Sequence, residues 1–294
     1  MEKKRHVLSI QSHVVSGYVG NKCATFPLQL LGFEVDAINS VQFSNHTGYK
    51  IVKGEVLNDV HLSQLAEGIA ANDLDHYSHL LTGYVGSASF LKRIAQLVPI
   101  LKQKNPNLIY VCDPVMGDNG KLYVPDELVD IYKNEIVPLA DILTPNQFEL
   151  GLLVDQKITS LNDVKEAILK LHGKGPKTVV VSSTEIDNKL EALVSNSTDK
   201  CVIKIEIPKI PTNYTGSGDL FAALFLAHSH YEAELKTALE KTINSLHSVL
   251  LKTYEYRQGF NNDTVQKAKT KELRLIQSKY VIENPPDILK AQYL

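Results

Sequence analysis

The sequence predicts an α/β fold in which helices cover both faces of a mostly parallel β-sheet. Near its start the chain alternates between an apolar strand at residues 7–10, a helix at 22–31 and a second strand at 33–38. Such a unit implies parallel strands joined by a helix that crosses the sheet. Residues 108–112 are apolar throughout, which is typical of a strand buried on both faces. A chain of 294 residues, 44% of them hydrophobic, is long enough to bury such a sheet.

Composition narrows the class of protein. The formal net charge is −2, so nothing indicates binding to nucleic acid or to an anionic membrane. The three cysteines are far apart and in no metal-binding spacing, as in a reducing compartment. The basic residues 1–5 precede an apolar run that is too short and polar for a signal peptide. We expect a cytoplasmic protein and, because the sequence shows no repeats or linkers, a single domain over residues 1–294.

The later elements follow from periodicity and from the positions of glycine and proline. Helical spacing of apolar residues predicts helices at residues 59–71, 87–103, 126–133, 160–172, 234–251 and 272–279. Short apolar or β-branched runs predict strands at residues 79–84, 108–112, 140–143 and 177–183, and a hairpin from 190–194 and 202–207. Residues 41–49 are polar and aromatic and fit no regular element, so we expect a lid or binding loop there.

Polar side chains follow the predicted parallel strands where each one ends. These side chains are Ser12, Tyr84, Asp113, Asp118, Asn146, Glu149, Ser182 and Ser183. Ligands of open α/β sheets bind at the carboxyl ends of the strands, so we expect the set to surround a site. The two aspartates can hold a hard cation through oxygen, although Asp, Asn and Gly also dominate ordinary turns. Asn146 and Glu149 fit a magnesium site on a polyphosphate or, alternatively, a capping box at a helix start.

A glycine-bounded loop, Thr-Gly-Ser-Gly-Asp at residues 215–219, runs directly into an apolar, alanine-rich helix pattern. Glycine lets a ligand approach closely, and a helix start leaves backbone N–H groups open to an anion, usually phosphate. Asp219 would repel that anion unless it has a chemical role. Accepting the proton of a hydroxyl that attacks phosphorus is such a role.

Two other interpretations of this loop stay open. The glycines can serve only a tight turn, with the aspartate as a common first-turn residue. Gly216 and Gly218 also half match a dinucleotide-binding fingerprint, in which Phe221 takes the place of the third glycine. Pro208 and Pro211 interrupt the strand that this fingerprint needs. The sequence contains no G-x-x-x-x-G-K-[ST] motif, which excludes a P-loop nucleotide enzyme.

The chain resembles the ribokinase-like vitamin kinases over nearly its whole length. The motifs Asn146-x-x-Glu149 and Gly216-x-Gly218-Asp219 are general to that group, and residues 40–49 resemble its pyridoxal branch. The resemblance implies a three-layer αβα sandwich and transfer of the ATP γ-phosphate to the 5′-hydroxymethyl group of pyridoxal, pyridoxine or pyridoxamine. It also implies a homodimer, Mg²⁺ (or Zn²⁺) with the ATP, and a monovalent cation, K⁺ (or Na⁺).

The resemblance also assigns a role to each candidate residue. Asp219 would be the base, and the anion hole would consist of the N–H groups of Gly216, Ser217 and Gly218. The vitamin would be held by Ser12, Val19, Phe43, Thr47, Tyr84 and Asp219. ATP would be bound by Asp113, Asp118, Tyr123, Asn146, Glu149, Ser182, Ser183, Ile210, Gly216 and Ser217. Asp118 would position Mg²⁺ with Asn146 and Glu149, and the monovalent cation would lie at Asp113, Thr144 and Glu149.

Two positions depart from the group. Ser217 stands where a threonine is common, which keeps the hydroxyl. The loop at residues 117–123, which covers ATP in the group, is shorter than in animal-type members, so we expect its effect on nucleotide affinity to differ from theirs.

Two alternatives for function stay open. One is hydroxymethylpyrimidine as the acceptor on the same scaffold, and the other is a non-catalytic module that binds nucleotide or pyridoxal phosphate.

Overall fold

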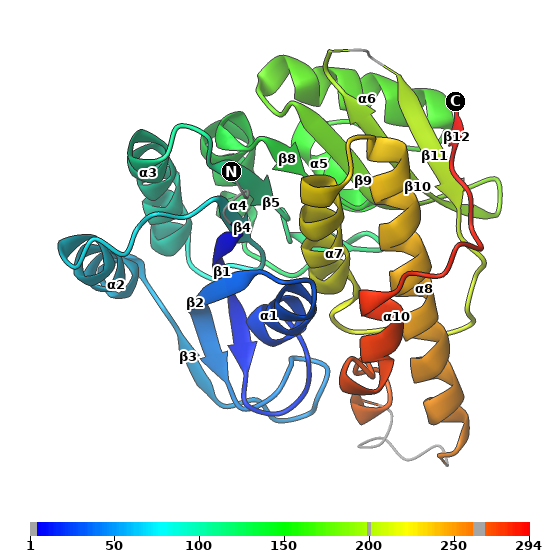
Figure 1. The fold of residues 1–294 in the computed structure, drawn as a ribbon, viewed down its shortest axis with the longest axis horizontal. Coiled ribbons are helices and arrows are strands. Elements are labelled where there is room, and N and C mark those ends of the chain that lie inside the picture. Colours follow the sequence, from blue (N-terminus) through cyan, green and yellow to red (C-terminus); the bar gives the residue numbers. More distant parts are fainter. Residues whose placement is uncertain (1–4, 199–200, 261–267) are drawn as a thin grey trace.

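The computed structural model describes residues 5–198, 201–260 and 268–294. Residues 1–4 of the basic start therefore lie outside the described residues. A ten-stranded sheet runs through the described chain, in the order β12-β11-β10-β9-β8-β5-β4-β1-β2-β3 (Figure 1). The sheet joins segments from both ends of the chain, because β1 is the third strand from one edge and β12 forms the other edge.

The central strands are parallel, as the sequence predicted. They are β9 (Thr178–Ile186), β8 (Ile142–Leu143), β5 (Ile109–Cys112), β4 (His79–Thr82), β1 (His6–Val14) and β2 (Glu34–Phe43). Antiparallel strands extend both edges: β3 (Gly54–Val56) beside β2, and β10 (Lys189–Asn196), β11 (Val202–Glu206) and β12 (Gln292–Tyr293) beyond β9. All the parallel strands therefore direct their carboxyl ends to the same side of the sheet.

Helices cover both faces of the sheet, which confirms the three-layer arrangement (Figure 1). One face carries α1 (Asn21–Leu30), α7 (Ser217–Tyr231), α8 (Leu235–Gln258) and α10 (Lys279–Glu283). The other carries α2 (Asp59–Ala71), α3 (Ala88–Lys104), α4 (Asp126–Ile131), α5 (Gln147–Val154) and α6 (Leu161–Lys174). Strand β5 shows why its sequence is apolar throughout. Tyr110 and Cys112 join the core under α2–α6, whereas Val111 joins the core under α1, α7 and α8.

The structure differs from the predicted type of element most clearly at residues 41–43 and 272–279. Residues 41–43, expected in an irregular loop, are the last residues of β2. The helix expected at 272–279 is wrong: a 3₁₀ turn at Ile276–Ser278 and then α10 form instead. The reason is that Glu272 pairs with Thr215 in an isolated parallel bridge, which keeps its backbone extended rather than helical.

The short loop at residues 117–123 is a hairpin of β6 (Gly117–Asp118) and β7 (Lys121–Leu122). Its turn residues Asn119 and Gly120 have φ angles of 50° and 77°. Two successive positive φ angles are typical of a type I′ turn, for which Asn-Gly is the preferred sequence. The Asn-Gly pair was the signal that could have predicted this hairpin.

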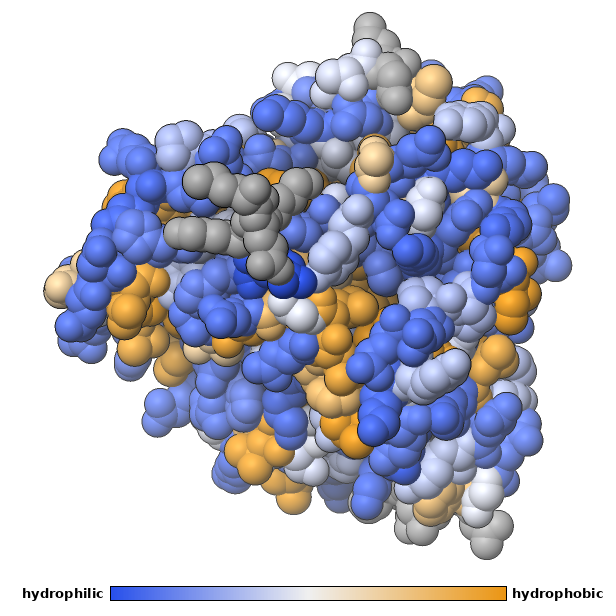
Figure 2. Space-filling view, viewed as in Figure 1, coloured by the Kyte–Doolittle hydropathy of each residue, from blue (hydrophilic) through white to orange (hydrophobic). Residues whose placement is uncertain are grey.

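The face that carries α1, α7 and α8 is largely hydrophilic, with an apolar group near its centre over α1 and α7 (Figure 2). In the described ranges, no helix is both long and apolar enough to cross a lipid bilayer.

Candidate active site

Helix α7 begins at the glycine loop that the sequence singled out. Its N-cap is Gly216, whose φ of 89° lies in the left-handed region that favours glycine. A Cβ there would also lie 2.6 Å from the carbonyl oxygen of Tyr18. Among the described residues, no side chain caps this helix, as is also true of α1, α4, α8 and α10, whereas α2, α3, α5 and α6 are each capped by the side chain of the preceding residue. The first-turn N–H groups of α7, those of Ser217 and Gly218 among them, are thus open to an anion.

Asp219 lies in that first turn, half-buried, and its Oδ2 accepts a 2.7 Å hydrogen bond from the backbone N–H of Gly20. Gly20 in turn packs on Ser12, because a Cβ at Gly20 would lie 2.3 Å from the hydroxyl oxygen of Ser12. Burial raises the pKa of Asp219, and the N–H of Gly20 opposes that shift. The structure therefore brings the expected base close to Ser12, an expected contact of the acceptor.

A buried carboxylate lies behind the glycine loop. Asp113 follows β5, and its Oδ1 accepts a 3.1 Å hydrogen bond from the hydroxyl of Thr144. Its Oδ2 has no hydrogen-bond partner among the described residues and faces Gly218, whose Cβ, if present, would be 3.8 Å away. Burial raises the pKa of Asp113, and the carboxylates of Glu149 and Asp219 raise it further. An oxygen without a donor, inside a group of carboxylates, fits a cation.

Glu149 is buried next to Asp113, but both of its oxygens already have donors. Oε1 accepts the N–H groups of Met116 at 3.0 Å and Gly117 at 3.4 Å, and Oε2 accepts that of Asn146 at 2.9 Å. The side chain of Asn146 accepts the N–H of Glu149 at 2.9 Å, which confirms the capping box at the start of α5. Burial raises the pKa of Glu149 to about 8, although these three N–H groups oppose the shift. Glu149 thus fixes the β6–β7 hairpin to α5.

Asp118 immediately precedes the turn of that hairpin, and Tyr123 follows its second strand. Asp118 is exposed and accepts hydrogen bonds from the N–H and the side-chain amide of Asn119, at 2.7 and 3.0 Å. The amide of Asn146 donates to the carbonyl of Gly117 at 2.8 Å, which holds Asp118 beside the start of α5. Tyr123 is 54% exposed. The structure therefore brings Asp118, Asn146 and Glu149 together, as expected from the sequence.

The other candidates for ATP binding are less closely grouped. Ser182 and Ser183 lie within β9, beyond the end of its neighbour β8. The N–H of Ser182 donates to the carbonyl of Pro145 at 2.9 Å, next to Asn146. Ile210 lies in the irregular segment between β11 and α7, and in the described ranges no hydrogen bond joins it to either serine.

The candidates for the acceptor gather at the carboxyl ends of β4, β1 and β2. Ser12 lies at an irregularity of β1, and Phe43 is the last residue of the adjacent β2. Tyr84 follows β4, which is the other neighbour of β1. Val19 precedes Gly20, and Thr47 is exposed in the turn after β2. The sheet order thus separates acceptor candidates on β4, β1 and β2 from nucleotide candidates on β5, β8 and β9.

Several residues that shape this site have little or no local signal in the sequence. Gly20 supplies the donor to Asp219, and a glycine before a helix was the only signal for it. Cys23 is buried under the glycine loop and donates from Sγ to the carbonyl of Gly216 at 3.1 Å. Tyr49 and Glu272 are hydrogen-bonded at 2.9 Å. Neither pairing has a sequence signal, because each joins segments that are distant in the chain.

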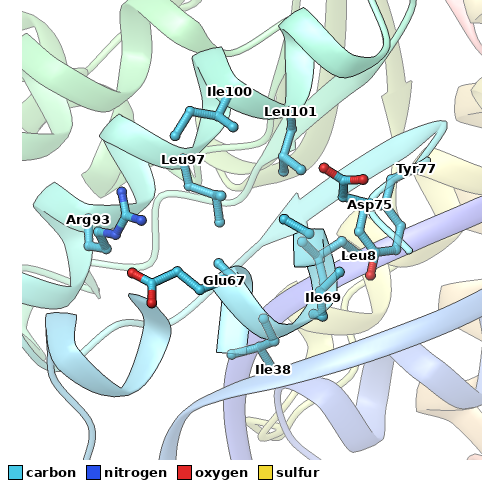
Figure 3. A pocket seen from close by; sticks show the side chains of 12 residues that line it. Leu8, Ile38, Glu67, Ile69, Asp75, Tyr77, Arg93, Leu97, Ile100 and Leu101 are labelled. Atoms are coloured by element: carbon cyan, nitrogen blue, oxygen red, sulfur yellow. The ribbon is translucent and has the colours of Figure 1, made fainter. Parts of the chain in front are cut away.

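Two other features lie away from the carboxyl ends of the strands. A cavity of about 130 Å³ lies between α2, α3 and the sheet. Figure 3 shows Glu67 and Ile69 of α2 opposite Leu97 of α3. Asp73, Asp75 and His76 offer ligand atoms within 4.8 Å of one another. Lys104 already forms ion pairs with both aspartates, at 2.6 and 3.3 Å. Their negative charges are therefore balanced without a metal ion.

Comparisons with known proteins agree with this architecture. The family model described as phosphomethylpyrimidine kinase matches residues 33–264. A pyridoxal kinase from Arabidopsis thaliana is 51% identical over 292 residues, covering 97% of this chain and 94% of the relative. The human pyridoxal kinase is 46% identical over 312 residues, with 100% of both chains covered.

Solved structures give the same result. A pyridoxal kinase from Leishmania donovani, in complex with ADP and pyridoxamine, superposes with a TM-score of 0.90 at 36% identity, covering 99% of this chain and 100% of that chain. The pyridoxal kinase from Trypanosoma brucei has a TM-score of 0.87 at 34% identity, with 100% of both chains covered. Since both the sequence matches and the fold extend over the full length of these relatives, the chain belongs to the pyridoxal kinase family.

Proposed function

We propose that this chain transfers the γ-phosphoryl group of ATP to the 5′-hydroxymethyl group of pyridoxal, pyridoxine or pyridoxamine, with Asp219 as the base. ATP-dependent phosphorylation of these vitamers is the activity of the family to which it belongs. The observation that carries the proposal for this chain is the start of α7. An uncapped helix N-terminus there lies beside a half-buried carboxylate that Gly20 orients.

The roles follow from the arrangement of the strands. The first-turn N–H groups of residues 216–218 bind the phosphoryl group and stabilise the negative charge that develops on it. Asp219 accepts the hydroxyl proton of the vitamin, which lies over the ends of β4, β1 and β2. ATP lies over the ends of β5, β8 and β9, so that its γ-phosphate meets the hydroxyl at α7. Phosphoryl transfer depends mainly on such positioning and on charge neutralisation.

Cations complete the charge balance in this proposal. The surroundings of Asp113 suit a bound cation, because its buried Oδ2 has no donor among the described residues and lies close to two other acidic side chains. Asp113, Thr144 and Glu149 would hold K⁺ (or Na⁺), and Asp118, with Asn146, would hold Mg²⁺ (or Zn²⁺) on the ATP. Such cations neutralise phosphate charge. We also propose a single domain, a homodimer and a cytoplasmic location for this protein.

The decisive experiment measures ADP release by the purified chain with Mg-ATP and either pyridoxal or hydroxymethylpyrimidine. We expect kcat/KM for pyridoxal to exceed that for hydroxymethylpyrimidine by at least about tenfold, or about 1.4 kcal/mol. The opposite preference would favour the alternative acceptor, which the description of the matching family model suggests. No ADP release with either alcohol would favour the non-catalytic binding module.

A further inference from the structure

Glu272 contacts the three segments that surround the reacting groups. The first is the turn of residues 46–49, which contains Thr47. The second is the segment of residues 17–20, which contains Val19 and the N–H donor to Asp219. The third is the glycine loop at the start of α7. The first two contacts are made by the carboxylate of Glu272 and the third by its backbone, so one residue can hold all three segments together.

The turn contacts one carboxylate oxygen through a hydrogen bond at one end and a longer approach at the other. The hydroxyl of Tyr49 donates to Oε1 of Glu272 at 2.9 Å. Nε2 of His46, a residue only 5% exposed, lies 3.4 Å from the same oxygen. Nδ1 of His46 accepts the N–H of Gly48 at 3.1 Å, which leaves the ring proton on Nε2, facing Glu272. The acidic oxygen therefore holds Tyr49 by a hydrogen bond and lies next to His46 at the other end of the turn that presents Thr47.

The second segment packs on the same carboxylate. A Cβ on Gly17 would lie 2.7 Å from Oε1 and 2.9 Å from Cδ of Glu272, so only glycine leaves room for the carboxylate here. Gly17 has a φ of 97°, which also favours glycine. A shift of Glu272 would thus remove the carboxylate that packs directly against the backbone at Gly17.

The third contact uses the backbone of Glu272. It pairs with Thr215 in an isolated parallel bridge, and the N–H of Thr215 donates to the carbonyl of Lys271 at 3.1 Å. Thr215 immediately precedes Gly216, the N-cap of α7. Because this contact is made by the main chain, a side-chain substitution at Glu272 leaves it in place and removes only the other two.

We propose that Glu272 is a positioning residue that couples the vitamin-binding segments 17–20 and 46–49 to the phosphoryl-binding loop. This inference rests on the proposed function. The side chain of Glu272 is 87% buried. Burial and Glu272 raise the pKa of Tyr49 to about 12. Both observations agree with a fixed donor–acceptor pair. The chemical consequence is that the carboxylate orders the vitamin side of the site and leaves the ATP side unchanged.

The test is a set of variants assayed separately for each substrate. In Glu272→Ala we expect the KM for pyridoxal to rise at least about tenfold, with kcat and the KM for ATP changed less than about threefold. Glu272→Gln should recover part of this loss, because its amide oxygen can still accept the hydroxyl of Tyr49. Tyr49→Phe should raise the same KM, and the double variant Tyr49→Phe/Glu272→Ala should be no worse than Glu272→Ala alone.

Glu283→Ala, an exposed glutamate of α10, is the matched control and should leave both KM values unchanged. An unchanged KM for pyridoxal in Glu272→Ala would overturn the inference. So would an equal loss in both KM values and in kcat together with a lower melting temperature, because that pattern indicates general destabilisation. If the unmodified chain releases no ADP with pyridoxal, the proposed function fails first, which distinguishes the two outcomes.

Discussion

Asp219 and Gly20 are 199 residues apart in the sequence, yet the backbone N–H of Gly20 donates a 2.7 Å hydrogen bond to Oδ2 of Asp219. A main-chain donor cannot rotate away as a side chain can, so it holds Oδ2 of the carboxylate in place. The other oxygen, Oδ1, is then the one available for a substrate proton. The geometry of the base is therefore set by the segment that also carries Val19.

The first prediction concerns Asp219→Asn. Since burial raises the pKa of Asp219, the folded protein binds that proton more tightly than the unfolded chain, and stability falls as pH rises above the unfolded pKa. At pH 7.5 the amide removes this cost, so we expect a higher melting temperature without ligands. Turnover should fall by roughly 10²–10⁴-fold. Calorimetry and ADP release check the two effects, and turnover near that of the unmodified chain would refute the base assignment.

The second prediction concerns Gly20→Ala. The new Cβ would lie 2.1 Å from the carbonyl oxygen of Ser12, and the φ of 53° is unfavourable for alanine. The segment must shift, so the N–H moves away from Asp219 and we expect at least about a tenfold loss of kcat. Gly173→Ala in α6 is the control, because, apart from the adjacent backbone of its own helix, no heavy atom of the described residues would lie within 4 Å of its Cβ. That variant should be as active as the original and slightly more stable.

The sequence predicted most of the elements that local patterns determine. Helix α2 was predicted at residues 59–71, and the structure has it at Asp59–Ala71, because Asn58 caps a regular helix there. The strand ends that carry Asp113 and Asn146 were also predicted, since apolar strands and following polar residues are local signals. The strand at residues 140–143 was longer in the prediction than β8, which covers only Ile142–Leu143.

What the sequence could not predict depends on contacts between distant segments. Residues 272–279 have a helical pattern, but the pairing of Glu272 with Thr215 keeps their start extended. No local signal indicates that the hydroxyl of Tyr49 donates to Glu272, which is 223 residues away in the sequence. The role of Gly20 likewise depends on where α7 lies, and the position of a helix over a sheet is a property of the whole fold.

The third prediction tests the cation site at Asp113. Its buried Oδ2 lacks a donor among the described residues, so K⁺ or Mg²⁺ should stabilise the folded protein more than the unfolded chain. We expect either chloride salt to raise the melting temperature by at least about 2 °C, compared with tetramethylammonium chloride at the same ionic strength. Asp113→Asn should abolish that shift. Asp130→Asn, an exposed carboxylate of α4, should keep it. An equal shift in both variants would place the cation elsewhere.

The last prediction concerns stability in acid. His228 of α7 is 4% exposed, and burial, with the positive charge of Lys241, lowers its pKa from 6.5 to about 4. Between about pH 6.5 and pH 4 the unfolded chain therefore binds a proton at His228 that the folded protein does not bind. The free energy of unfolding falls as the pH is lowered through this range. Between pH 7.5 and pH 5 the loss of unfolding free energy from this residue is about 2 kcal/mol.

In His228→Leu that part of the loss should vanish in urea titrations at the two pH values, because no buried imidazole remains to be protonated. If His228→Leu loses as much stability in acid as the original chain, the buried imidazole is not the cause.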